Sequence, residues 1–148
     1  MVVVSIAAIL VIALGFEFQG WIGRYKIENQ IKQMYVDVMN TRARAMHRNR
    51  FHMIVLTANT YTAYEDMNEN EAVDAAEILP AYPKTLDNYP MVWTGGGNTI
   101  TFNTRGLLVP PTRTVTILAG VDSDYDCMTV LDTKTNMGKW NGLVCQIK

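Results

Sequence analysis

The sequence predicts an α+β protein in which one long N-terminal α-helix packs on an antiparallel β-sheet or sandwich domain. Three observations support this fold class. Residues 1–16 carry no charge, apolar residues then recur at helical intervals to about residue 48, and short alternating segments follow from residue 51. With 148 residues, the chain has room for one domain of ordinary size.

Residues 1–18 are predicted to form a hydrophobic helix that lies in a membrane or in the core of a filament. The run MVVVSIAAILVIALGF is shorter than the roughly 20 apolar residues of a membrane span and longer than the about 10–14 of a signal-peptide core. A signal peptide would carry positive charge before the run and a small-x-small cleavage site after it. No basic residue precedes Val2, and the segment FEFQGW from Phe16 is a poor cleavage site. A membrane or filament helix is therefore favoured.

Residues 19–50 are predicted to continue this helix as an amphipathic segment, with Trp21 and Tyr25 as anchors at the membrane surface. A continuous helix to about Arg48 would be roughly 70 Å long, which a globular domain of this size cannot enclose. We therefore expect lipid or other subunits to cover its first part. The face that packs on the domain is expected to contain Ile27, Ile31, Met34, Val38 and Ala45.

Residues 51–148 are predicted to form an antiparallel β domain of about seven or eight short strands. Phe51–Ala58 and Thr60–Glu65 are expected to pair as a hairpin that turns near Ala58 and Asn59. Prolines, the Thr104–Gly106 turn and the Gly95–Gly97 triplet mark connections between strands. The other strands are expected at Thr99–Asn103, Leu107–Val109, Arg113–Leu118, Cys127–Leu131 and Gly142–Ile147.

Charge is distributed unevenly along the chain. The net charge is -1 overall, but residues 1–50 carry seven basic and three acidic side chains, whereas residues 51–148 carry six and eleven. An acidic globular part argues against a general nucleic-acid-binding protein. The arginines at the predicted helix end could contact an anionic partner, but cations that stabilise the helix C-terminus are the favoured interpretation. These arginines are Arg42, Arg44, Arg48 and Arg50.

Cys127 and Cys145 are the two cysteines of the chain. Behind a membrane anchor they fit one disulfide in an oxidising compartment, and the alternative is two unpaired buried thiols. Pairing requires Cα atoms within about 7 Å of each other. We expect this separation if Cys127–Leu131 and Gly142–Ile147 are neighbouring strands.

No set of residues predicts catalysis, and we expect neither an enzyme nor a bound cofactor. His47 and His52 lack the glutamate of a metal-hydrolase helix motif. One stretch does have the spacing of calcium ligands, but Glu71 occupies the position where an EF-hand loop needs glycine, and a strand rather than a helix precedes it. An acidic turn is the favoured interpretation and a calcium site the alternative. The residues at loop positions 1, 3, 5, 9 and 12 are Asp66, Asn68, Asn70, Asp74 and Glu77.

Several stretches, in their order along the chain, resemble the GspH/FimT family, which comprises minor pseudopilin H of type II secretion and FimT-like minor pilins. MVVVSIAAILVIAL is similar to the later part of the prepilin N-terminal signature, and MNTRARAMHRNRFHMIVL to the helix end and first strand of the family. The segments DMNENEAVDAAEIL, ITFNTRGLL and DCMTVLDTKTNMGKW, followed by Cys145, continue the resemblance. Mature family members begin with a methylated Phe and a short apolar stretch containing Glu, behind a basic leader. We expect such a segment to precede Met1, bringing the apolar run to about 22 residues.

The resemblance implies a pilin-like fold and a structural minor pilin or pseudopilin of a type II secretion pseudopilus or type IV pilus. It implies other pilin subunits and inner-membrane lipid as partners. It also implies a single-pass protein whose C-terminal domain is periplasmic before assembly. A DNA-binding FimT-like pilin is an alternative, which would use Lys134, Lys139 and Lys148, and the acidic domain opposes it. A generic single-pass membrane-anchored domain is the remaining alternative.

Overall fold

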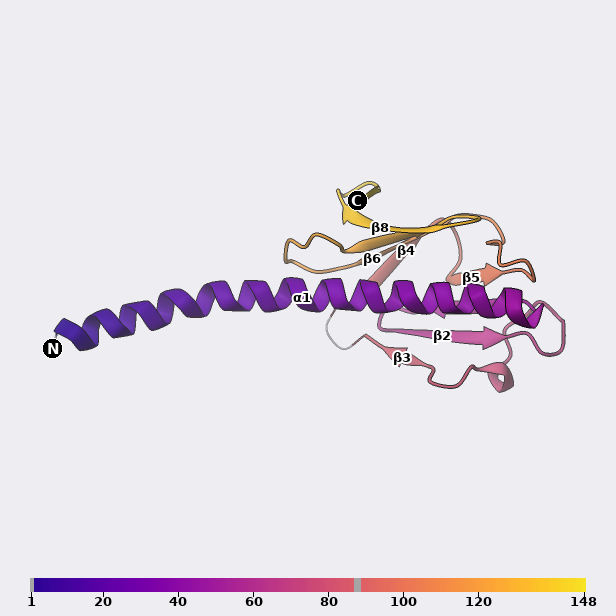
Figure 1. Ribbon diagram of the computed structural model, residues 1–148, viewed down its shortest axis with the longest axis horizontal. Coiled ribbons are helices and arrows are strands. Elements are labelled where there is room, and N and C mark those ends of the chain that lie inside the picture. Colours follow the sequence, from indigo (N-terminus) through magenta and orange to yellow (C-terminus); the bar gives the residue numbers. More distant parts are fainter. Residues whose placement is uncertain (1, 87–88) are drawn as a thin grey trace.

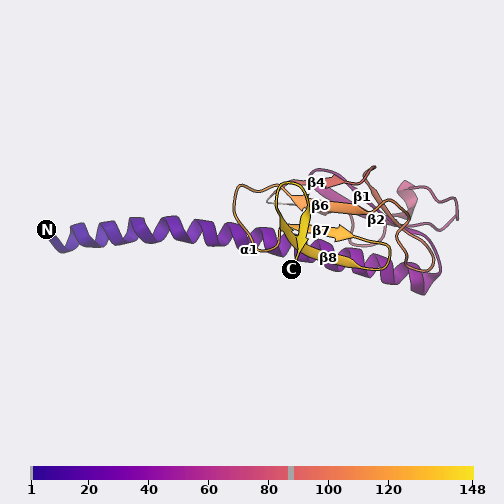
Figure 2. The same ribbon diagram turned by 90° about the horizontal axis from the view of Figure 1, so that it is seen from above.

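A long helix and two antiparallel sheets make up the protein. The computed structural model describes residues 2–86 and 89–148, with side chains from residue 20 onward. Helix α1 (Val2–Arg48) runs along the sheets and extends well beyond them at its N-terminal end (Figure 1). Seen from above, the β domain lies along only the C-terminal part of α1 (Figure 2). The α+β fold class predicted from the sequence is therefore confirmed.

The predicted membrane or filament segment, residues 1–18, is helical from Val2, and its side chains lie outside the described residues. Within the described part of the chain, no helix has the length and hydropathy of a membrane span.

The first sheet has four antiparallel strands in the order β3-β2-β1-β5. Strands β1 (His52–Leu56) and β2 (Thr60–Glu65) form the predicted hairpin, in which His52 pairs with Glu65. On the other side of β1 lies β5 (Thr99–Phe102), and the two-residue strand β3 (Lys84–Thr85) pairs with β2. The segment between β2 and β3 contains a short 3-10 helix, η1 (Ala75–Glu77).

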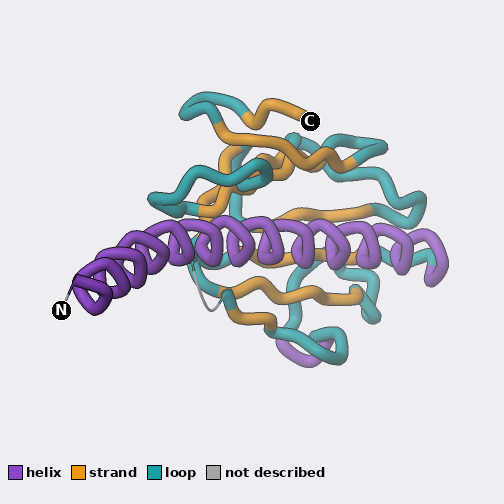
Figure 3. Tube along the Cα trace, turned by 60° about the vertical axis from the view of Figure 1, so that its left-hand side comes forward, coloured by secondary structure: helices purple, strands orange, loops and turns teal. Residues whose placement is uncertain are grey.

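The second sheet has five antiparallel strands in the order β4-β6-β7-β8-β9. In Figure 3 strands lie on both sides of the α1 trace. Each strand pairs with its neighbour in the order given. The strands are β4 (Met91–Thr94), β6 (Arg113–Ile117), β7 (Cys127–Val130), β8 (Thr135–Trp140) and β9 (Cys145–Ile147).

Three expectations about the strands were wrong. Leu107–Val109 makes only an isolated bridge, between Leu108 and Phe102, instead of a strand. The sequence predicts no strand at β8, because Thr135 and Gly138, which occupy its buried positions, give no hydrophobic alternation. Since β8 lies between β7 and β9, the two cysteine-bearing strands are not direct neighbours.

One face of α1 closes the hydrophobic core between the sheets. Ile27, Ile31, Met34, Val38 and Ala45, here called the buried stripe, are each 0% exposed. They belong to one cluster with buried side chains of both sheets. Full burial of an aliphatic side chain of this size contributes about 1.5–3 kcal/mol relative to exposure. The C-terminal part of the helix is thus an integral part of the domain. Its partners in the sheets include Ile54, Leu56, Phe102, Val115 and Met128.

Candidate assembly surface

The opposite side of α1 carries a second set of apolar residues that the domain does not cover. Val36 and Met46 are each 52% exposed and Met39 is 36% exposed. Toward the N-terminus follow Trp21 and Tyr25, whose rings stack with centroids 6.3 Å apart. At 3.6 residues per turn, these five positions fall within about 80° of one another around the helix axis. They form one surface, here called the exposed stripe.

A buried acidic residue fixes the orientation of α1 on the first sheet. Asp37 is 7% exposed, and its carboxylate accepts a hydrogen bond from the Tyr61 hydroxyl at 2.6 Å. Lys84 on β3 donates to both oxygens of the same carboxylate, at 2.8 and 2.7 Å. The contact joins the helix to β2 and β3, so α1 cannot rotate about its axis without breaking it. The orientation of the exposed stripe is thereby determined.

The tyrosines around Asp37 are held in their protonated form. Burial raises the pKa of Tyr61 far above its ordinary value, and the hydrogen bond to Asp37 adds to this effect. Burial also raises the pKa of Tyr82 to about 12, with a further contribution from the charge of Asp37. The rings of Tyr61 and Tyr82 meet edge to face, with centroids 6.1 Å apart. Sequence reasoning missed this cluster, although an acidic residue beside the buried positions 34 and 38 was a signal for it.

Most of the arginines at the end of α1 contact other groups of the same chain. Arg42 is 5% exposed, donates to the Leu131 carbonyl at 2.7 Å and lies over the Phe102 ring at 4.8 Å. Burial lowers the pKa of Arg42. Arg48 and Arg50 approach one carboxylate oxygen of Glu65 at 4.0 and 3.8 Å. These contacts reduce the positive charge that the cluster could offer an anionic partner.

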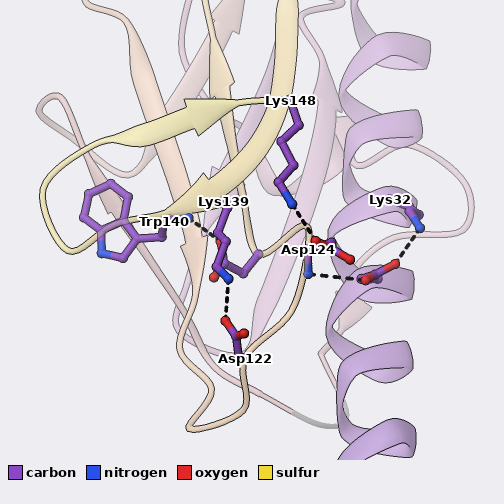
Figure 4. A network of polar contacts seen from close by, with 8 residues as sticks. Lys32, Asp122, Asp124, Lys139, Trp140 and Lys148 are labelled. Carbon is purple, nitrogen blue, oxygen red and sulfur yellow. Dashed lines mark hydrogen bonds and ion pairs between the residues drawn. The ribbon is translucent and has the colours of Figure 1, made fainter.

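Two of the three C-terminal lysines considered for DNA binding, Lys139 and Lys148, lie in a network of acidic partners (Figure 4). Lys139 pairs with Asp122, and Lys148 pairs with Asp124. Hydrogen bonds and charge from these lysines lower the pKa of each aspartate. A lysine that already faces a carboxylate neutralises a phosphate less effectively, so the network opposes the DNA-binding alternative. Of the three lysines, Lys134 is exposed and has no ion pair among the described residues.

The same network connects the C-terminus to α1. Glu28 on the helix accepts hydrogen bonds from Lys32 at 2.9 Å and from the Asp124 backbone N–H at 3.4 Å. On the sheet, the Asp126 carboxylate accepts the Trp140 backbone N–H at 2.6 Å. Burial raises the pKa of Asp126, and the hydrogen bond from Trp140 partly offsets this. The C-terminal strands therefore have a fixed place beside the helix.

The cysteines form the expected disulfide, with an S–S distance of 2.00 Å and Cα atoms 5.9 Å apart. Because β8 separates the two strands, the bond crosses over β8. Gly138 allows β9 to lie close to β8, since a Cβ at this position would lie 2.0 Å from the carbonyl oxygen of Gln146 on β9. The disulfide holds the last strand close to the sheet.

The two histidines do not form a site. His47 is exposed at the helix end, whereas His52 is 0% exposed in β1. Its Nδ1 lies 3.2 Å from the Arg50 carbonyl, and its Nε2 lies 3.9 Å from a carboxylate oxygen of Glu65. Burial lowers the pKa of His52, which favours the neutral imidazole.

The residues with calcium-ligand spacing lie in the segment between β2 and β3, here called the acidic loop (residues 66–77). Backbone N–H groups of the loop donate to the side chains of Asp66, Asn68 and Asn70. Among the described residues, no group of three or more His, Cys, Asp or Glu is arranged to hold a metal ion. The calcium site therefore stays a prediction.

The architecture is that of a pilin. A crystal structure of the type IV minor pilin FimU from Pseudomonas aeruginosa (strain PAO1) is similar, with a TM-score of 0.60 and 13% sequence identity. The match covers 78% of this chain and 90% of that one. At this identity the likeness establishes a shared fold: a helix packed on antiparallel sheets.

Family membership follows from the sequence match. Residues 30–133 match the family described as type II transport protein GspH, and the chain belongs to this family. No curated protein gives a significant match. The matched range includes the C-terminal part of α1, the first sheet, and strands β4, β6 and β7 of the second sheet with the β7 half of the disulfide. The resemblance inferred from the sequence is confirmed.

Proposed function

We propose that this protein is a minor pilin or pseudopilin that assembles through α1 into a type II secretion pseudopilus or a type IV pilus. The observation that carries the proposal is the exposed stripe. It is apolar, lies on a helix whose orientation Asp37 fixes, and faces away from the sheets. GspH family membership and the pilin fold support the same role.

The mechanism is the transfer of apolar surface from lipid or water into contacts between helices. Side chains at positions 36, 39 and 46 repeat with spacings of three and seven residues, which lets a neighbouring helix pack against them. Full burial of one such side chain is worth about 1.5–3 kcal/mol, and these residues are already partly covered. Each contact between helices therefore contributes a modest free energy to assembly. In a filament these contributions add up, because the same contact is repeated between many subunits.

The proposed location follows from the same role. Before assembly, the N-terminal part of α1 lies in the inner membrane as a single span, with the β domain in the periplasm. After assembly, other pilin subunits replace the lipid around the helix. The role is structural, and binding to partner subunits rather than catalysis is the activity to measure.

Co-purification of the full-length chain with other pilin-like subunits from membranes tests the proposal. Val36→Lys and Met39→Lys should each abolish co-purification, because they place a charge within the helix contact. Asn40→Lys is the matched control, since it adds the same side chain at an exposed position of the next face of α1. Recovery of the wild-type chain as a monomer unlinked to any filament system would contradict the proposal. So would equal co-purification of all three variants.

A further inference from the structure

The C-terminal end of α1 covers a row of buried side chains in the first sheet. His52, the first residue of β1, pairs with Glu65 on β2 and with Phe102 on β5. Directly opposite residues of antiparallel strands point to the same face of a sheet. Arg42 of α1 lies over the Phe102 ring at 4.8 Å, so this is the face that the helix covers. Since His52 is 0% exposed and Glu65 is 6% exposed, both side chains are enclosed where the helix end meets the sheet.

The neutral imidazole of His52 leaves one ring nitrogen without a partner. Nδ1 lies 3.2 Å from the Arg50 carbonyl oxygen, which can only accept a hydrogen bond, so we assign the proton to Nδ1. Nε2 is then an acceptor, and it is buried without a hydrogen-bond partner among the described residues. It lies 3.9 Å from Oε2 of Glu65, which is an acceptor as well. A second proton on the ring would therefore bind at Nε2, beside this carboxylate.

Positive charges of the helix end lie near this position. Arg48 and Arg50 approach Oε1 of Glu65 at 4.0 and 3.8 Å, so they already offset the negative charge beside the ring. Burial lowers the pKa of His52, and the charges of Arg44 and Arg48 act in the same direction. The Arg50 carbonyl and Glu65 oppose this lowering of the pKa without overcoming it. The folded protein therefore favours the neutral imidazole.

The other charged groups close to the helix end have partners elsewhere. Arg42 donates to the Leu131 carbonyl at 2.7 Å. The carboxylate of Asp66, which follows Glu65 in the chain, accepts two backbone N–H groups of the acidic loop at 3.1 and 2.9 Å. Strand β5 contributes no ionisable side chain. A positive charge on His52 would thus have to be offset by Glu65, which two arginines already share.

We propose that His52 is a proton-sensitive contact, which lets the end of α1 pack on the first sheet when the imidazole is neutral and loosens this end when it is protonated. The protonated ring is a buried cation, which is costly away from water, and it competes with Arg48 and Arg50 for one carboxylate. The loosened end includes Met46, so acidification also acts on the exposed stripe. The effect belongs to the folded subunit and does not require assembly.

Melting curves of the full-length chain in detergent micelles, from about pH 7.5 to about pH 4.5, test this contact. The stability that the neutral ring contributes is complete above the unfolded pKa of about 6.5 and is lost as the pH falls through the lower folded-state pKa of His52. His52→Gln removes the titrating ring, so its fall in melting temperature should be about 2–4 °C smaller than that of the wild type. His47→Gln is the matched control, because it removes the exposed histidine of the helix end and should leave the fall unchanged.

Two measurements on the wild type keep the test valid if His52→Gln folds poorly. The chain contains two histidines, so their ring signals can be assigned in an NMR titration. His52 should titrate at a lower pH than His47, because it is buried and His47 is exposed. Below the pH at which His52 titrates, the backbone amides of residues 44–50 should lose protection against hydrogen exchange, whereas those of β7 should keep it.

Three results would overturn the proposal. They are titration of His52 at or above the pH of His47, equal falls in melting temperature for His52→Gln and the wild type, and unchanged protection of residues 44–50. None of them would affect the assembly proposal, which rests on the exposed stripe.

Discussion

The two stripes of α1 are both apolar but have different surroundings. The buried stripe packs against both sheets and is 0% exposed, whereas the side chains of the exposed stripe are 36% to 64% exposed. Asp37 lies beside the buried stripe and holds the helix in one rotational position. The comparison shows that one helix can serve two interfaces. One is completed when the subunit folds, and the other is available to a neighbouring subunit.

The buried stripe should dominate the stability of the subunit. Ile31→Ala should lower the free energy of unfolding by about 2–5 kcal/mol, because it leaves a cavity in a packed core. Val36→Ala on the exposed stripe should change it by no more than about 0.5 kcal/mol. Denaturant unfolding of the full-length chain in micelles measures both. Equal destabilisation would show that the two stripes do not differ as described.

The disulfide should matter for folding and not for the proposed interface. Replacing both Cys127 and Cys145 by Ala should cost about 3 kcal/mol of stability, since the bond closes a loop over a sequence separation of 18. At a temperature where the variant remains folded, it should co-purify with pilin-like subunits as the wild type does. Loss of co-purification by the folded variant would place part of the interface on the second sheet.

The tyrosines around Asp37, beside the buried stripe, should make the free energy of unfolding depend on pH in the alkaline range. The folded-state pKa of Tyr82 is raised to about 12, so folding favours the protonated phenol. The stability that this contributes is complete below the unfolded pKa of about 10 and is lost as the pH rises toward 12. Tyr61 has its pKa raised in the same direction and adds to the effect.

Melting curves recorded across this pH range measure the effect. Tyr82→Phe should reduce the loss of melting temperature on alkalinisation, because its phenol no longer ionises. Tyr25→Phe on the exposed stripe is the control and should leave the pH dependence unchanged. The same slope in both variants would exclude a role for Tyr82.

The main elements of the fold could be predicted from the sequence because their periodicity is strong. The buried positions of α1 repeat with helical spacing, and β2 alternates between buried and half-buried positions, whereas β1 is a short run of mostly buried apolar residues. Strand β8 could not be predicted, since Thr135 and Gly138 are buried without being large and apolar. Gly138 has no side chain, which allows β9 to lie close to β8. This role of Gly138 can be recognised only when the neighbouring strand is known.

The surface for assembly was harder to predict than the core. The sequence predicts one hydrophobic face on α1, but apolar side chains also occur outside that face, and one of them, Met46, is 52% exposed. Val36 and Met39 belong to the second face, which periodicity alone does not separate from the first. The role of Asp37 depends on Tyr61 and Lys84, which lie 24 and 47 residues away in the chain. Such long-range partners have no local sequence signal.

Accessibility of single cysteines before and after assembly tests most directly whether α1 forms the interface. Cys127 and Cys145 are joined in the disulfide, so Val36→Cys and Val92→Cys each introduce one reactive thiol. The two valines are similarly exposed in the subunit, 52% on α1 and 40% on β4. Maleimide should label both in the dissociated subunit, and assembly should protect position 36 and leave position 92 reactive. Protection of position 92 with position 36 still labelled would contradict assembly through the helix.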